Sequence, residues 1–133
     1  MHRVDSRSYV GEPGETVTVT TQVDGGGQVD VVVHGENLGT GGQFTLPPTP
    51  GDHLRMQVAL AGPLGASCVV TIASVDGSAD ADLLLCQAHD PAPVHFYNFS
   101  VGAAAVVAKF ARAAGRPRAG AAVRRAPKKG GRR

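Results

Sequence analysis

Short segments in which apolar and polar residues alternate, separated by runs of glycine and proline, dominate the first hundred residues. Residues 16–23 (TVTVTTQV) place Val17, Val19 and Val23 on one side, and residues 53–60 (HLRMQVAL) alternate in the same way. Successive side chains of a β-strand point to opposite faces, so this period of two predicts half-buried strands. The same criteria predict further strands at residues 28–34, 44–46, 67–75, 82–88 and 94–101.

The turns between these segments limit the architecture. Runs of turn-forming residues lie at 24–27 (DGGG), 47–51 (PPTPG) and 90–93 (DPAP). About seven or eight short strands with turns every ~8–12 residues predict an all-β chain, namely a small antiparallel β-sandwich that is immunoglobulin-like or jelly-roll-like. The Cys…Trp…Cys spacing of a true immunoglobulin domain is missing, because the chain has no Trp. The glycine-rich turn also predicts that residues 16–34 form a β-hairpin.

The last three predicted strands are apolar on both faces. Val69, Ala73 and Val75 oppose the apolar set that begins at Cys68, and residues 83–85 are three consecutive leucines. A strand that is apolar on both faces needs cover on both faces. One face would meet the second sheet of a sandwich, so we expect another element to cover the other face.

The segment that follows has the composition of such a cover. Residues 102–114 (GAAAVVAKFARAA) are rich in alanine, and they carry apolar residues at helical spacing, which are Ala103, Val106, Val107, Phe110 and Ala114. We expect an amphipathic helix over residues 102–114 that packs on the outer face of the sheet built from residues 68–101. Residues 1–101 would then be an acidic β-sandwich domain, and residues 115–133 a disordered basic tail, because Val123 is their one large apolar residue.

Membrane and secretory segments are not expected. No run approaches the ~18–20 apolar residues of a membrane span, and residues 1–15 lack the apolar stretch of a secretory signal. The sequence therefore predicts a cytoplasmic protein with no membrane partner. In that compartment Cys68 and Cys86 are expected to be reduced, although neighbouring strands would permit a disulfide between them.

Charge is divided sharply along the chain. Residues 1–101 hold three arginines against eleven Asp and Glu, a formal charge of −8, whereas residues 102–133 hold ten cations and no acid, a formal charge of +10. Cationic segments of this kind hold phosphates by releasing counterions. In composition, about twenty residues of the tail are similar to the Lys/Arg-Ala-Pro tails of bacterial histone-like and linker-histone-like proteins. The expected nucleic-acid-binding residues are Lys109, Arg112, Arg116, Arg118, Arg124, Arg125, Lys128, Lys129, Arg132 and Arg133.

Carboxylates at alternate positions suggest one metal site. Asp76, Asp80 and Asp82 lie in the sequence DGSADAD, and clustered carboxylates on a tight loop suit a hard cation such as calcium. The start of this run has the spacing of an EF-hand loop, but Ala81 stands where that loop requires glycine. The alternative is an acidic, solvated hairpin loop.

No nucleophile with a placed base emerges from the sequence. Gly-x-Ser-x-Gly is missing, and both cysteines lie in apolar strands. Cys86 and His89 have the spacing of two zinc ligands, but the sequence offers no second pair. We therefore predict a non-enzymatic interaction module, without a cofactor, whose cationic tail binds nucleic acid or another polyanion without sequence preference. The alternative is a structural or assembly subunit that forms a homo-oligomer through its β-sandwich, with a tail that only solubilises.

Overall fold

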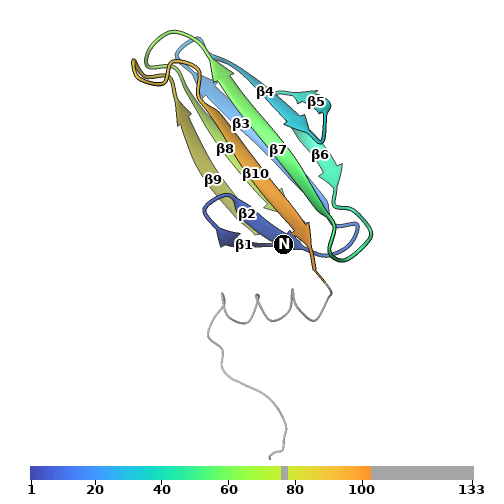
Figure 1. Ribbon diagram of the computed structural model, residues 1–133. Helices are drawn as coiled ribbons and strands as arrows, with labels where there is room; N and C mark the ends of the chain where they lie inside the picture. The colour runs from blue at the N-terminus through green and yellow to red at the C-terminus, as the bar shows by residue number, and fades with distance from the viewer. Residues whose placement is uncertain (76–77, 103–133) are drawn as a thin grey trace, which may run out of the picture.

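Ten strands form two sheets that lie face to face in a computed structural model, which describes residues 1–75 and 78–102 (Figure 1). One sheet has six strands in the order β1-β2-β10-β7-β4-β5, and the other has four in the order β6-β3-β8-β9. All strand pairs are antiparallel except β2 and β10, which run parallel. The strands are β1 (His2–Asp5), β2 (Ser8–Gly11), β3 (Thr16–Asp24), β4 (Gln28–Val33), β5 (Glu36–Gly39), β6 (Gly42–Thr45), β7 (His53–Ala61), β8 (Ser67–Ser74), β9 (Ala79–Leu85) and β10 (Val94–Val101).

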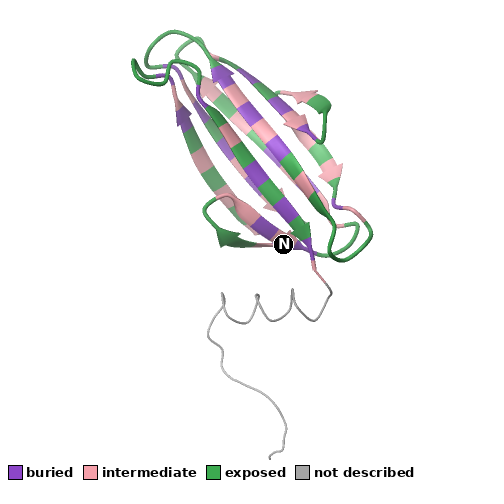
Figure 2. Ribbon diagram, in the orientation of Figure 1, coloured by how far each residue is buried: buried purple, intermediate pink, exposed green. Residues whose placement is uncertain are grey.

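The core lies between the two sheets and follows the alternation of the sequence. Buried residues alternate with intermediate or exposed ones along β7, β8 and β10, so each strand contributes one face to the core (Figure 2). Tyr97 and Phe99 of the six-stranded sheet are fully buried, as is Val70 of the four-stranded sheet. Phe44 from β6 meets Phe99 edge-on, with ring centroids 5.2 Å apart, and so joins the two layers. The all-β prediction is confirmed.

The expected hairpin over residues 16–34 is wrong. β3 pairs with β6 and β8 in one sheet, while β4 pairs with β5 and β7 in the other. Residues 24–27 therefore cross between the layers. Gly25 has a φ of 78°, and a Cβ there would lie 2.9 Å from Cα of Ala66, so this crossing packs tightly on the segment between β7 and β8.

The expected single sheet over residues 68–101 is also wrong. β8 and β9 form a hairpin in the four-stranded sheet, but β10 lies in the six-stranded sheet. The apolar residues on their second faces thus do not form one continuous surface. Val69 and Leu83 share the outer face of β8 and β9, whereas Phe96 lies on the outer face of the other sheet. The expected helix over 102–114 and the tail over 115–133 lie outside the described residues from Ala103 onward.

Two regions without strand patterns in the sequence form strands. Residues 2–11 supply β1 and β2, and the glycine-rich stretch 35–42 supplies β5 and the start of β6. β2 pairs with the second half of β10, from Asn98 to Val101. The first half of β10 thus has a strand neighbour on the β7 side alone, among the described residues.

Two adjacent leucines in β9 provide a test of which side chains of this strand point into the core. Leu84 is 1% exposed and Leu83 is 54% exposed. We expect Leu84→Ala to lower the free energy of unfolding by about 2–5 kcal/mol, because it empties a core site. Leu83→Ala should change it by less than about 1 kcal/mol. Urea unfolding of both variants measures the difference, and equal losses would contradict the register of β9.

Candidate functional site

A polar cluster spans the gap between the two sheets at the side where β9 is the edge strand. We call it the Asp82 cluster, and it consists of Asp82, Arg7, His95 and Tyr97. Asp82 comes from β9 of the four-stranded sheet, while His95 and Tyr97 come from β10 of the six-stranded sheet. Arg7 lies in the turn between β1 and β2. The cluster thus gathers side chains from three segments that are far apart in the sequence.

Strand alternation explains why these side chains meet. Asp82 shares the inward face of β9 with Leu84, and His95 shares the inward face of β10 with Tyr97. These two inward faces lie opposite each other across the core. The Asn98 amide donates a hydrogen bond to the Arg7 carbonyl at 2.9 Å, which holds the β1–β2 turn against β10.

One carboxylate oxygen accepts three hydrogen bonds. Oδ2 of Asp82 lies 2.7 Å from Nε of Arg7, 2.7 Å from the Tyr97 hydroxyl and 3.0 Å from Nδ1 of His95. Nη2 of Arg7 also lies 3.3 Å from Nε2 of His95. Because the guanidinium can only donate, Nε2 of His95 accepts in this contact and Nδ1 donates to Asp82.

The cluster shifts the pKa values of Asp82, Tyr97 and Arg7. Burial alone would favour the neutral Asp82, but hydrogen bonds from Arg7, Tyr97 and His95 outweigh it and lower the pKa of Asp82 from 3.8 to about 2. Burial, followed by the hydrogen bond to Asp82, raises the pKa of Tyr97 well above its ordinary value. The hydrogen bond to Asp82 likewise raises the pKa of Arg7. Asp82 is therefore an anion and Tyr97 a neutral donor at neutral pH.

The arrangement suits a structural clasp better than catalysis. An Asp–His pair acts as a base when the second ring nitrogen faces a nucleophile. Here that nitrogen faces Arg7, which cannot give up its proton. Oδ1 of Asp82 accepts a hydrogen bond from the Leu83 amide at 3.0 Å, so the same carboxylate also satisfies a donor of the edge strand.

The structure places two of the three expected calcium ligands in β9. Asp80 and Asp82 are two residues apart on the inward face of that strand, whereas Asp76 lies outside the described residues. Asp82 is held by Arg7, and Oδ1 of Asp80 lies 3.8 Å from Nε of Arg3. Within residues 1–75 and 78–102, no group of three His, Cys, Asp or Glu side chains could hold a metal ion. Calcium binding to Asp76, Asp80 and Asp82 thus stays a prediction.

Other expected sites fall elsewhere. All ten cations from Lys109 to Arg133 lie outside the described residues, so nucleic-acid binding is also a prediction that no observation tests. Cys68 and Cys86 are free thiols in the core, and burial raises the pKa of Cys68. In the described part of the chain, no helix has the length and apolar content needed to cross a bilayer.

Arg7, His95 and Tyr97 were not identified as site residues from the sequence. One signal was available: Asp82 and Leu84 are two residues apart, so any strand over this segment places them on the same face. A carboxylate on an apolar face requires a partner. The identity of that partner could not be read, because Arg7 lies 75 positions away in a segment with no apolar pattern.

The low pKa of Asp82 gives an acid dependence of stability. A carboxyl whose pKa falls from 3.8 to about 2 on folding stabilises the fold above pH 4, and this contribution disappears as the pH falls toward 2. We expect Asp82→Asn to cost about 1–2 kcal/mol at pH 7, discounted because the carboxylate is 29% exposed. The difference from wild type should shrink between about pH 4 and pH 2.

Unfolding in urea at a series of pH values measures that difference. Asp30→Asn is the matched control, because Asp30 is an exposed carboxylate on β4. Its difference from wild type should be close to zero throughout. An Asp82→Asn variant as stable as wild type at pH 7 would contradict the clasp.

Comparison with known proteins adds no further assignment. No protein-family model, curated protein or solved structure matches this chain.

Proposed function

We propose that this protein is a non-enzymatic interaction module whose cationic C-terminal segment binds nucleic acid without sequence preference. The observation that carries the proposal is the division of charge, −8 over residues 1–101 and +10 over residues 102–133. Ten cations with no acid among them attract phosphate through counterion release, which does not depend on base sequence. A cytoplasmic location fits this function and is part of the proposal.

The cations of the acidic domain support the assignment of binding to the tail. Arg3 lies near Asp80 and Arg7 is held by Asp82. The guanidinium of Arg55 lies 5.1 Å from the centre of the Phe96 ring. Each of these three arginines thus has a partner within the domain, and the surrounding carboxylates repel phosphate. We infer that this domain is a β-sandwich, immunoglobulin-like or jelly-roll-like, that carries the tail.

A second candidate is assembly through the outer face of the four-stranded sheet. Val69 and Leu83 are cross-strand partners there, and they are 38% and 54% exposed. Neighbouring apolar side chains on a sheet face favour contact with another surface. Under this alternative, sedimentation of the full chain shows a homo-oligomer that Leu83→Lys dissociates, and the tail has no part in it.

Salt dependence of DNA binding tests the leading proposal. We expect the full chain to bind a labelled duplex at low salt, and the logarithm of affinity to fall with the logarithm of salt concentration at about −0.9 per phosphate neutralised. Engagement of half of the ten cations gives a slope of about −4 to −5. Replacing Arg124, Arg125, Lys128 and Lys129 by Gln should make the slope shallower by up to about 4.

The matched control is Arg55→Gln, which removes a cation of the β domain. It should leave the salt slope unchanged, because Arg55 packs on Phe96. No binding at low salt would exclude the nucleic-acid proposal. An equal loss in the Arg55→Gln variant would move the binding surface from the tail to the β domain.

A further inference from the structure

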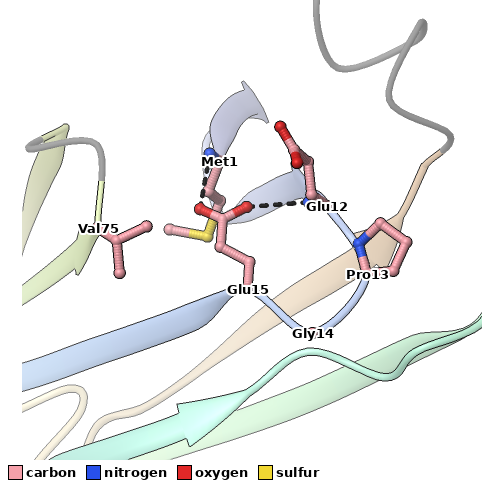
Figure 3. A pocket seen from close by; sticks show the side chains of 6 residues that line it. All are labelled: Met1, Glu12, Pro13, Gly14, Glu15 and Val75. Carbon is pink, nitrogen blue, oxygen red and sulfur yellow. Dashed lines mark hydrogen bonds and ion pairs between the residues drawn. The ribbon is translucent and has the colours of Figure 1, made fainter.

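A small pocket lies at the end of the β domain where the described chain stops. We call it the end pocket, and it has a volume of about 200 Å³. Its lining residues are Met1, Glu12, Pro13, Gly14, Glu15 and Val75. Figure 3 shows the Met1 and Val75 side chains beside Glu15, with Pro13 on the far side. Apolar side chains from Met1, Pro13 and Val75 thus line the pocket together with the carboxylates of Glu12 and Glu15.

Hydrogen bonds give the end pocket a fixed frame. The Glu15 carboxylate accepts from the Met1 ammonium at 2.8 Å through Oε2, and from the Glu12 amide at 2.9 Å through Oε1. Met1 is 5% exposed as a result, and its thioether side chain becomes part of the wall. Val75, unlike Met1, is not buried in this wall: it is 77% exposed. An apolar side chain at a pocket mouth gains stability when another apolar group covers it.

The chain leaves the β domain beside this pocket. The Val101 amide donates to the Asp52 carbonyl at 2.9 Å, and the Gly102 amide donates to the Gly11 carbonyl at 3.0 Å. Gly11 directly precedes Glu12, the first residue of the pocket wall. Phe110 follows Gly102 by eight residues, which span about 12 Å as a helix or up to about 28 Å when extended. Because Gly102 is hydrogen-bonded to the residue before Glu12, a segment of this length can turn back onto the adjacent pocket.

The sequence of the departing segment matches the pocket in size and charge. A cavity of about 150 Å³ accepts a benzene molecule, so the end pocket has room for one phenyl ring. Phe110 stands between Lys109 and Arg112. Those two cations would lie near the exposed carboxylate of Glu12 when the ring occupies the pocket.

We propose that the end pocket is the docking site for residues 103–112 of the same chain, with Phe110 inserted against Met1, Pro13 and Val75. This replaces the expectation that the segment covers a sheet face. Docking anchors the root of the cationic tail to one end of the β domain. The proposal concerns the domain's own surface and is independent of what the tail binds.

A double-mutant cycle in the full chain tests the contact. Val75→Ser and Phe110→Ser should each lower the melting temperature by about 4–8 °C, and the double variant should fall no further than the lower of the two. Val75 is 77% exposed, and Phe110 follows the strands that build the buried core, so the domain should fold in every variant. A melting temperature unchanged by Phe110→Ser, or additive effects of the two changes, overturns the proposal.

Leu64 provides the matched control for this cycle. It is 66% exposed and lies in the connection that precedes β8, whereas Val75 directly follows β8, so the two residues lie at opposite ends of that strand. Leu64→Ser should show no coupling to Phe110→Ser. Coupling as strong as that of Val75 would mean that Phe110 acts on stability without occupying the end pocket, and would overturn the proposal.

Cross-linking identifies the occupant directly. In the full chain, Val75→Cys with Phe110→Cys should form an intramolecular disulfide, whereas Leu64→Cys with Phe110→Cys should not, because a disulfide requires Cα atoms within about 7 Å. Cys68 and Cys86 are buried and do not compete. Equal cross-linking of both pairs overturns the proposal. Cross-linking only between molecules would assign the pocket to the tail of a second copy, and would also overturn docking within one chain.

Discussion

Burial of one face of each long strand between two sheets is the constraint on which the other features of this protein depend. The core contains few aromatic residues, so contacts among aliphatic side chains such as Val31, Val58 and Ile72 supply most of its apolar burial. Burial by small side chains requires that many strands each contribute a face, and ten short strands meet that requirement. The connections must then cross between layers repeatedly, which accounts for the glycines in the crossings at residues 24–27 and 62–65.

The Asp82 cluster closes the side of the two sheets where β9 is the edge strand and water can reach the core. β9 is an edge strand, and the first half of β10 lacks a second strand neighbour among the described residues. Apolar side chains at this opening would be wetted, whereas an ion pair with hydrogen bonds tolerates partial exposure. Asp82 also accepts from the Leu83 amide, so the same carboxylate satisfies a backbone donor of this edge strand.

The sequence predicted which residues are buried better than it predicted which strands are neighbours. Alternation identified Val17, Val19, Met56 and Leu60 as core residues, and each is at most 1% exposed. The same pattern could not distinguish a hairpin over residues 16–34 from a crossing between sheets, because both bury the same valines. Strand neighbours depend on contacts between distant segments, and a single sequence gives no measure of those contacts.

The residues of the Asp82 cluster were also hard to predict, because they come from segments that are distant in the sequence. Alternating carboxylates at Asp80 and Asp82 were visible in the sequence, and they were interpreted as calcium ligands on a loop. In the structure β9 begins at Ala79, so Asp80 and Asp82 lie on the inward face of a strand and not on a loop. The charge division needed no such information, because it depends only on composition along the chain. Its consequence, binding of phosphate by the tail, is accordingly a proposal from the sequence alone.

The position of acidic residues limits how many tail cations are available for phosphate. Glu12 and Asp52 are exposed at the end where the chain leaves the β domain, and charges interact over a Debye length of about 8 Å at physiological salt. If residues 103–112 dock as proposed, Lys109 and Arg112 lie within that distance of the domain and offset its carboxylates. On the same proposal, the eight cations from Arg116 onward could extend by up to about 3.5 Å per residue and so leave the range of these carboxylates. Docking would then limit the salt slope of DNA binding to about −7, short of the value of about −9 that ten free cations would allow.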